Sequence, residues 1–272
     1  MANLYVSLFG RRAFYGWNQR LLNLAVRGMG VGSPTSALVM PAETRFLQSL
    51  GQLGTCNVFD VGAHVGEWAI LLRRFSPNAR IWSFEPHPGS YRQLTEAAQA
   101  SGFTAVNLGL SDRRGTLQLY DYQGASASGT GAGSSHASVH PEVFSDIHHG
   151  EATAVEVEVT TVDDFLDSAG IDHLTLLKID AEGHELAILR GATRALTAGR
   201  ISIVQFEFNE MNVISRVFFR DFYEALPAFD FFRMVVDGLA PMGAYQPRTH
   251  ELFIPQNVVA IRSGLEGREA IV

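Results

Sequence analysis

The chain has 272 residues, of which 46% are hydrophobic and 18% are charged, so it can bury a large core and is neither disordered nor fibrous. Its net charge of −7, with arginines scattered along the sequence, argues against a general nucleic-acid binder, and its single cysteine excludes an intramolecular disulfide and a cysteine-rich zinc site. Because it has no signal-type stretch and no run of about 18 apolar residues, we expect a cytoplasmic protein without stable membrane insertion.

Residues 1–50 are predicted to form a helical N-terminal extension. Apolar residues recur at roughly helical spacing from Leu4 to Val31, and a second helix is expected over 42–50. We expect the extension to pack on the main domain, with a second subunit or a substrate as the alternatives. Binding to a membrane surface is disfavoured, because only Arg11, Arg12, Arg20 and Arg27 supply positive charge. A homodimer through these helices is one arrangement that the segment allows. Residues 51–272 then form the main domain.

Short apolar runs alternate with helical segments through most of the remaining chain. This alternation is typical of an α/β domain with a mostly parallel sheet that is covered by helices on both faces. The last two runs are separated by a loop with glycine and proline, so we expect them to close the sheet as a hairpin-like pair. The runs span 57–61, 80–84, 104–108, 174–179, 201–208, 231–236 and 257–262.

The segment 121–153 interrupts this pattern. Residues 124–138 are almost entirely Gly, Ala, Ser and Thr, which are too small and polar to form core. A long loop inside a compact domain is usually a lid, a binding loop or a disordered segment. We expect a substrate lid, in which His136 is the leading candidate for a general base. A half-exposed strand follows at 155–160, where valines alternate with polar residues.

The strongest local motif is VFDVGAHVGE at 58–67, a strand that runs into a glycine-containing turn and then a helix. Gly62 and Gly66 let the backbone approach a ligand and aim helix N–H groups at it. The second strand ends at Glu85 and Pro86, where an acid suits the two hydroxyls of a ribose. Together these features indicate an adenosine-containing cofactor.

The residues around the glycines favour one such cofactor. A dinucleotide fold prefers Gly-x-Gly-x-x-Gly, but here Asp60 precedes the first glycine and His64 occupies the middle position. An acid that faces the cofactor would repel a pyrophosphate, whereas it can bind the ammonium group of S-adenosylmethionine directly or through water. Asp60, Gly62, His64 and Gly66 are therefore predicted contacts of a methyl donor.

Polar residues also follow the third and fourth strands. Ser111 and Asp112 either hydrogen-bond the adenine edge or simply form a turn. Lys178 and Asp180 share one face of the fourth strand, and Asp180 stands at its carboxyl end, where α/β sheets bind ligands. Lys178 is the only lysine in the chain, and an ammonium in an apolar strand is costly unless it is paired. A structural salt bridge is the alternative to a catalytic role.

A metal site is also conceivable at the strand ends. Glu207 and Asn209 share a face of the fifth strand and its exit, next to the expected position of Asp180. Oxygen ligands suit Mg²⁺, which would lower the pKa of an acceptor hydroxyl. The alternative is metal-free chemistry with a histidine as the base.

Four segments together resemble the FkbM-type S-adenosylmethionine-dependent methyltransferases, over about residues 55–262. They are VFDVGAHVG, FEPHP, LKIDAEGHE and IVQFEF, and the segment around Asp180 is the most specific. The family usually has asparagine where this chain has His64. The resemblance implies a class I (Rossmann-like) methyltransferase fold, with a seven-stranded, mostly parallel sheet and an antiparallel last strand. It also implies O-methylation of a hydroxyl on a sugar or a polyketide-like natural product, in secondary-metabolite or glycoconjugate biosynthesis.

We therefore predict an enzyme that takes its methyl group from S-adenosylmethionine and transfers it to a small hydroxyl-bearing acceptor. The predicted catalytic residues are Asp180, which also contacts the donor, Lys178 and His136. Two other functions stay open. An NAD-linked oxidoreductase is disfavoured by the turn sequence, and a non-catalytic S-adenosylmethionine-binding protein is disfavoured by the polar groups that converge at the strand ends.

Overall fold

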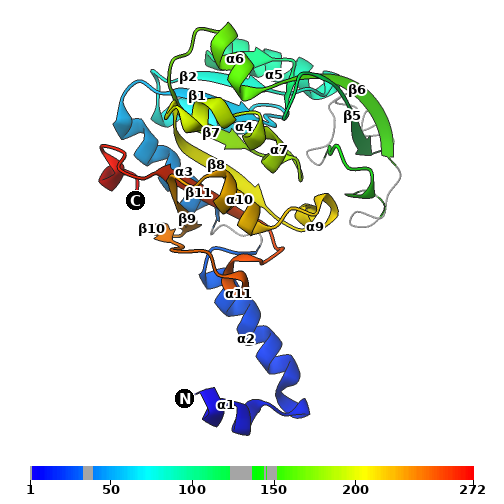
Figure 1. Ribbon diagram of the computed structural model, residues 1–272, viewed down its shortest axis with the longest axis vertical. Coiled ribbons are helices and arrows are strands. Elements are labelled where there is room, and N and C mark those ends of the chain that lie inside the picture. Colours follow the sequence, from blue (N-terminus) through cyan, green and yellow to red (C-terminus); the bar gives the residue numbers. More distant parts are fainter. Residues whose placement is uncertain (1, 33–38, 123–136, 144, 146–151) are drawn as a thin grey trace.

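A mixed sheet of eight strands forms the centre of the protein in the computed structural model, which describes residues 2–32, 39–122, 137–143, 145 and 152–272 (Figure 1). The strands lie in the order β10–β9–β11–β8–β7–β1–β2–β3. In that order they span Gly238–Pro241, Phe229–Val235, Gln256–Arg262, Ile201–Phe208, Leu174–Ile179, Asn57–Val61, Arg80–Phe84 and Thr104–Val106.

The strand pairing confirms the predicted class I arrangement. β1 is parallel to β2 and β7, β2 is parallel to β3, and β7 is parallel to β8. β11 is antiparallel to both β8 and β9, as expected for the closing pair. All seven predicted strands are present, and β10 adds an eighth at the edge of the sheet, antiparallel to β9.

Helices cover both faces of the sheet, because the central strands are apolar on both faces. On one face, α3 (Val39–Leu50) and α4 (Glu67–Phe75) pack against Val58 of β1. The next residue, Phe59, packs on the opposite face against a second set of helices. These helices are α6 (Val162–Ser168), α7 (Glu185–Arg190), α8 (Thr193–Thr197) and α10 (Phe219–Ala225). The remaining helices of the body are α5 (Pro88–Ser101), α9 (Met211–Ser215) and α11 (Pro247–His250).

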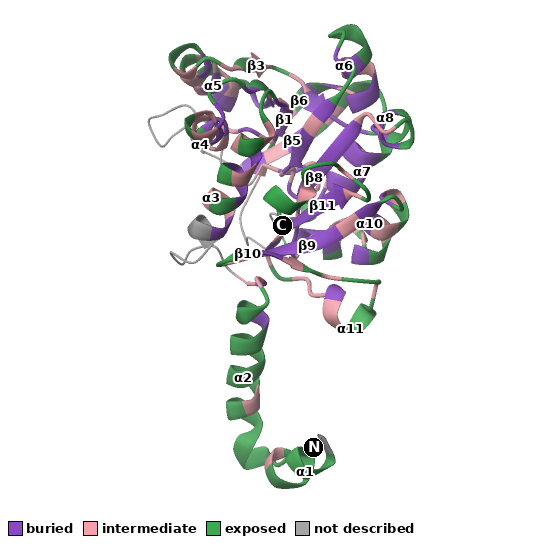
Figure 2. Cartoon of the chain, turned by 90° about the vertical axis from the view of Figure 1, so that its left-hand side faces the viewer, coloured by how far each residue is buried: buried purple, intermediate pink, exposed green. Residues whose placement is uncertain are grey.

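α3 is part of the core, although it falls within the predicted N-terminal extension, 1–50. Its Phe46, Leu47 and Leu50 are at most 2% exposed and pack with residues of β1 and β7. The segment that projects from the body consists of α1 (Ala2–Phe9), a 3-10 turn (Arg12–Phe14) and α2 (Tyr15–Gly28), as Figures 1 and 2 show.

Contrary to our expectation, the projecting segment does not pack on the main domain. Figure 2 shows α1 and α2 almost entirely exposed, and Leu24 and Trp17 retain 67% and 44% of their accessible surface. Burial begins only at the base, with Val26 and Val31. Within the described part of the chain, the apolar side chains of α2 other than Val26 are therefore not buried against the body. None of the described helices combines the length and the hydrophobicity needed to cross a membrane.

A smaller sheet of three strands lies beside the large one. β4 (Gly109–Leu110) is parallel to β6 (Ala152–Thr160), and β5 (Gly115–Tyr122) is antiparallel to β6. The alternating valines predicted the second half of β6. The ends of the predicted lid, 121–122 and 152–153, belong to β5 and β6, while 123–136, 144 and 146–151 lie outside the described residues.

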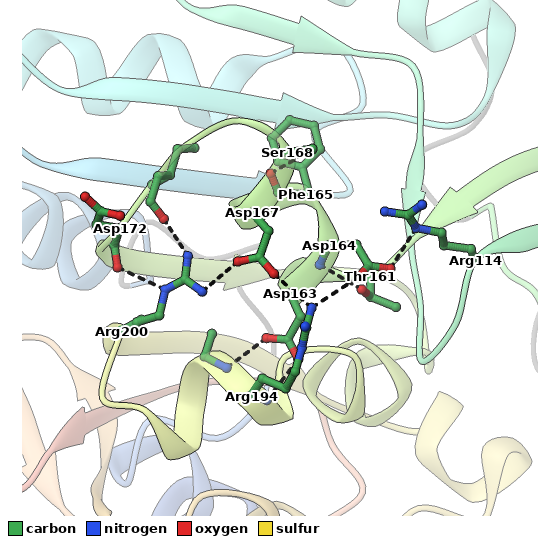
Figure 3. A network of polar contacts seen from close by, with 12 residues as sticks. Arg114, Thr161, Asp163, Asp164, Phe165, Asp167, Ser168, Asp172, Arg194 and Arg200 are labelled. Atoms are coloured by element: carbon green, nitrogen blue, oxygen red, sulfur yellow. Dashed lines mark hydrogen bonds and ion pairs between the residues drawn. The ribbon is translucent and has the colours of Figure 1, made fainter.

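Charged side chains join α6 to the elements around it (Figure 3). Arg194 donates to Asp164 and Asp167, and Arg114 reaches Asp164 from the loop before β5. These guanidinium groups are largely exposed, at 63% and 67%, so each pair contributes little to stability. Asp163 differs because it is buried: its carboxylate accepts from the backbone N–H groups of Arg194 and Ala195 and caps the N-terminus of α8.

We expect the substitution Asp163→Ala to lower the free energy of unfolding by about 2 kcal/mol, because two N–H groups of α8 lose their acceptor. Asp164→Ala is the matched control, since it removes a neighbouring carboxylate that contacts exposed arginines, and should cost about 0.5 kcal/mol or less. Urea denaturation followed by circular dichroism measures both. Equal losses in the two variants would contradict the capping role of Asp163.

Candidate active site

The turn after β1 and the end of β7 are in direct backbone contact. The Asp180 N–H donates to the Val61 carbonyl at 3.0 Å. Gly62 has φ of +75°, and a Cβ at this position would lie 1.7 Å from the Asp180 carbonyl oxygen. Both the conformation and the close approach require glycine, and together they fix Asp180 beside the turn that leads into α4.

Gly66 satisfies a packing requirement at the start of α4. It has φ of +89°, and a Cβ would lie 2.9 Å from Leu94 Cδ1 and 3.0 Å from Phe103 Cζ. Glycine at this position therefore lets α4 approach α5 closely. Gly66 lines neither of the two cavities described below, and its predicted contact with a methyl donor stays a prediction.

Glu85 is held in place by the backbone on both sides. Its carboxylate accepts hydrogen bonds from the N–H groups of His64 and His87, each at 2.8 Å. The side chain is buried, and this burial raises the pKa of Glu85 to about 7 in spite of the two backbone bonds and with a smaller contribution from Asp60. Glu85 is thus a fixed carboxylate that changes its charge near neutral pH.

A cavity of about 90 Å³ opens beside this carboxylate, and we call it the Glu85 cavity. Its polar groups come from the large sheet and the segment after β7, including Asp180 and His184. Its apolar wall comes from both sheets and from the segments next to them. Leu110, Leu117, Leu119, Val157 and Val159 belong to the small sheet, and Val61 and Phe84 belong to the large one. The other apolar residues of the wall are Pro86, Ala181 and Ile188, with Ala137 and Val139 of the predicted lid.

A larger cleft of about 590 Å³ lies on the side of α3 and α4, and we call it the Glu43 cleft. Glu43 and Glu207 bring carboxyl groups to its wall, and Trp68 contributes an aromatic ring. Gly62, His64 and Asp180 line both this cleft and the Glu85 cavity. These residues form a junction between a small, mostly apolar cavity and a wider cleft with a more polar lining.

A buried ion pair supports the junction from inside the sheet. Lys178 Nζ lies 3.2 Å from Asp60 Oδ1 and 3.3 Å from Asp180 Oδ2. Burial disfavours the ammonium ion, but Asp60, Asp180 and Glu43 outweigh this effect and raise the pKa of Lys178 above its usual value. Lys178 thus forms the salt bridge that the sequence left open as the alternative to a catalytic role. It also lines the Glu43 cleft, and its predicted catalytic role stays a prediction.

Asp60 does not have the position that we predicted for it. Its side chain is fully buried, pairs with Lys178 and accepts from the Ser83 hydroxyl, and it lines neither cavity. The register of the sheet explains this, because Asp60 stands opposite Ser83 on β2 and Lys178 on β7. Its role is to neutralise the lysine, so it is unavailable as a direct donor contact.

The ion pair continues into a hydrogen-bonded network on the same face of the sheet. Gln205 stands opposite Lys178 on β8, and its Nε2 donates to Glu43 Oε1 at 3.2 Å. The same carboxylate oxygen accepts from Trp68 Nε1 at 3.0 Å. Burial raises the pKa of Glu43, although Lys178 partly opposes this. The network connects α3, α4, β7 and β8 directly beneath the Glu43 cleft.

Ser111 and Asp112 are not on the wall of the Glu85 cavity. Ser111 is buried, and its hydroxyl lies 2.9 Å from Nε2 of His184 and 3.2 Å from Asp112 Oδ1. His184 is the residue of this group that lines the cavity. Burial and the neighbouring His140 lower the pKa of His184 to about 4, so its ring is neutral at pH 7.

The predicted Mg²⁺ site of Asp180, Glu207 and Asn209 is not supported. Asn209 Nδ2 donates to Glu207, and its Oδ1 accepts from the Met211 N–H, so both ends of the amide have protein partners. Burial and the charges of nearby acidic residues raise the pKa of Glu207 well above its usual value, which favours the neutral acid over the carboxylate that a metal prefers. Across the described residues, no cluster of three or more His, Cys, Asp or Glu side chains is arranged to hold a metal ion.

His136 lies outside the described residues, so its predicted role as a base stays a prediction. The described part of the predicted lid, 137–143, lies against the segment that comes after β7 in the chain. The Ser138 hydroxyl donates to the Glu182 carbonyl at 2.8 Å, and Val143 is buried against Met211. This part of the chain therefore forms a wall of the site.

Sequence reasoning missed several residues that shape the site. Glu43 and Trp68 lie on separate helices and show no motif that links them to Lys178. His87 caps α5 by accepting from the Gly89 and Ser90 N–H groups, a role in which histidine is uncommon. Glu185 accepts from the N–H groups of Ala181 and Gly183 and holds the turn after Asp180. In the sequence, Glu182 and Glu185 indicate only the start of the next helix.

Comparison with known proteins finds a methyltransferase domain model and several methyltransferases that resemble this chain. The model of the FkbM methyltransferase domain matches residues 60–235. Methyltransferase sdnD of Sordaria araneosa is 30% identical over 153 residues, which are 49% of this chain and 59% of that protein. The hexuronic acid methyltransferase AglP of Haloferax volcanii is 28% identical over 54% of each chain. The chain thus spans little more than half the length of these two relatives.

A further relative matches over a larger share of its length. The 2-O-methyltransferase NoeI of Sinorhizobium fredii is 22% identical over 74% of this chain and 82% of that protein. Among solved structures, an O-methyltransferase from Bacillus cereus in complex with SAH is 14% identical, with a TM-score of 0.43 and 96% of each chain covered.

We expect Lys178→Met to lower the free energy of unfolding by about 3–5 kcal/mol, because it leaves Asp60 buried without its counter-ion. The double variant Asp60→Val/Lys178→Met removes both charges and should be more stable than Lys178→Met alone. Urea denaturation of the two variants and of the unchanged protein measures the difference. A double variant that is less stable than Lys178→Met would show that Asp60 and Lys178 do not depend on each other.

Proposed function

The chain belongs to the FkbM methyltransferase family, and from this premise we propose that it transfers the methyl group of S-adenosylmethionine to a hydroxyl oxygen of a sugar or polyketide-like natural product. The observation that carries the proposal is the junction at Gly62, His64 and Asp180, where the Glu85 cavity meets the Glu43 cleft. A reaction between two molecules needs such a meeting point of two binding spaces.

The groups of the Glu85 cavity fit an adenosine. A fixed carboxylate at the end of β2 suits the two ribose hydroxyls, because each carboxylate oxygen can accept more than one hydrogen bond. The apolar wall of Pro86, Leu110 and Val157 suits the faces of an adenine ring. We assign the adenosine part of the donor to this cavity and its sulfur end to the junction.

The residues of the junction suit methyl transfer to oxygen. When bound, S-adenosylmethionine supplies an electrophilic methyl group on a positively charged sulfur. The hydroxyl must approach in line with that methyl group, so holding it in place accounts for much of the catalysis. Asp180 is 44% exposed at the junction and is fixed by Lys178, so it can accept the proton that the hydroxyl loses.

The Glu43 cleft supports an acceptor with several hydroxyl groups. Its carboxyl groups at Glu43 and Glu207 and the amide of Asn257 offer hydrogen bonds, and Trp68 offers an aromatic surface. The names of two relatives, a hexuronic acid methyltransferase and a 2-O-methyltransferase, agree with this class of acceptor. Incubation with methyl-labelled S-adenosylmethionine and a panel of sugars and polyketides, followed by mass spectrometry, tests the proposal. Reaction at nitrogen or carbon only would contradict it.

We expect Asp180→Asn to reduce turnover at least about 100-fold, because asparagine cannot take up the proton of the hydroxyl. The affinity for S-adenosylhomocysteine, measured by calorimetry, should change by less than about threefold, since the amide retains the shape of the side chain. A folded Asp180→Asn variant with full turnover would exclude Asp180 as the base.

We expect donor affinity to rise with pH, because the ribose hydroxyls donate to the ionised form of Glu85. With its pKa at about 7, the ionised fraction and hence the affinity should increase about tenfold between pH 6 and pH 8. Glu85→Gln should bind S-adenosylhomocysteine more weakly at pH 8 and lose this pH dependence. Calorimetry at both pH values measures this, and an unchanged pH dependence in Glu85→Gln would refute the role of Glu85. NAD serves as the control ligand, and we expect no binding.

A further inference from the structure

The apolar side chains of the projecting helix α2 are arranged along one side. Trp17, Leu21 and Leu24 follow one another at intervals of four and three residues, which places them on one face of the helix. All three are exposed, at 44%, 37% and 67%. Leu22 and Tyr15, which are 63% and 67% exposed, lie roughly 100–120° farther round the helix than Leu21, beyond Asn18, so apolar residues extend over about half of its circumference. An apolar surface of this extent is unusual on a monomeric protein in water.

The remaining side of α2, which begins next to Leu24, is polar and positively charged. Arg20 and Arg27 are seven residues apart, two helical turns, and share this side with Asn23. Arg11 and Arg12 add two charges at the turn between α1 and α2. The first acidic residue of the chain is Glu43, so residues 1–42 carry +4, whereas the other 230 residues carry −11. Charge of one sign is thus concentrated in the projecting segment.

α1 adds to the apolar surface at the far end of α2. Phe9 contacts the rings of Phe14 and Trp17, and Tyr5 contacts Phe9, so the two helices form one aromatic cluster. Leu4, Val6 and Leu8 remain exposed on α1, at 65%, 63% and 50%. The end of the projection that lies farthest from the body is therefore its most hydrophobic part.

The base of the projection lies at the same edge of the sheet as the active site. A Cβ on Gly30 would lie 2.2 Å from the carbonyl oxygen of Met234, near the end of β9, and Gly32 N donates to the Pro255 carbonyl just before β11. The first residue of β11 pairs with Phe208, the last residue of β8. Glu207, which lines the Glu43 cleft, is next to Phe208 in β8. The cleft and the base of the projection therefore lie at the same edge of the sheet, where β8 ends.

We propose that α1 and α2 form an interfacial anchor that docks this protein on the surface of an anionic lipid bilayer. Tryptophan, phenylalanine and leucine enter the boundary between headgroups and acyl chains, and the arginines contact the anionic headgroups. Charge complementarity selects this partner. The positive charge of the projection attracts such a surface, while the negative body remains in the aqueous phase. The anchor lies in the interface and does not span the bilayer.

A second copy of the chain explains these features less well. In a dimer formed through α2, two positive projections would face each other, and their arginines would find no counter-charge on the partner helix. Docking on a bilayer instead uses both the apolar face and the arginines. A stable dimer is nevertheless a distinct outcome that the experiment below detects.

Vesicle sedimentation tests the proposal on the full chain. The protein should sediment with vesicles of phosphatidylcholine that contain 30% phosphatidylglycerol, and much less with vesicles of phosphatidylcholine alone. Binding should weaken as salt rises, because the Debye length falls from about 10 Å at 0.1 M to about 3 Å at 1 M. Arg20→Glu/Arg27→Glu should reduce the partition coefficient at least about tenfold, and Trp17→Ser/Leu24→Ser should do the same without changing the net charge.

Arg80→Glu/Arg190→Glu is the matched control, because both arginines are exposed on the body and the change in net charge is identical. It should bind these vesicles within about twofold of the unchanged protein. Circular dichroism checks that each variant is folded, and sedimentation equilibrium without lipid gives the oligomeric state. No binding to the anionic vesicles, or equal losses in the control and in Arg20→Glu/Arg27→Glu, overturns the proposal. A dimer that Trp17→Ser/Leu24→Ser abolishes, without vesicle binding, assigns the surface to a second copy. No step of this test depends on the methyltransferase reaction.

Discussion

An ammonium group buried between the two central strands constrains the whole active-site side of the sheet. Lys178 needs a counter-ion because it is desolvated, and Asp60 on the neighbouring strand supplies it inside the sheet. The same ammonium group forms a second ion pair with Asp180, just after the end of β7. One cation therefore sets both the packing of β1 against β7 and the orientation of the carboxylate at the junction. The wide guanidinium of arginine, the usual cation of this chain, has a different shape and donor geometry.

Carboxylates that accept backbone N–H groups shape the loops around this centre. Glu85 joins the turn after β1 to the start of α5, and Glu185 closes the turn after Asp180. Asp163 does the same for α8, which lies on the same face of the sheet as α7. Because these bonds are made within the chain, the loops that line the Glu85 cavity have their form before any ligand arrives. Preorganisation of this kind reduces the entropy that a ligand must lose on binding.

The sequence predicted the strands well because continuous apolar runs mark strands that are buried on both faces, as in β7 and β8. It failed for β10, which has four residues with a glycine and a proline at its ends, and for the position of Asp60. The alternation along one strand shows which residues share a face, but only the register shows which residues of two strands meet. Asp60 and Lys178 are 118 positions apart in the chain, so their pairing required the fold. Glu43 and Trp68 were missed for the same reason.

The Glu85 cavity has walls from two different sheets. Its polar residues belong to the large sheet and the segments that follow its strands, while the small sheet of β4, β5 and β6 contributes five apolar residues. β5 and β6 pair with each other and β6 pairs with β4, so the small sheet forms without a strand of the large one. Substitutions on the small sheet can therefore change the apolar wall without replacing the carboxylates of the large sheet. The architecture therefore lets selectivity diversify during evolution while the reaction is preserved.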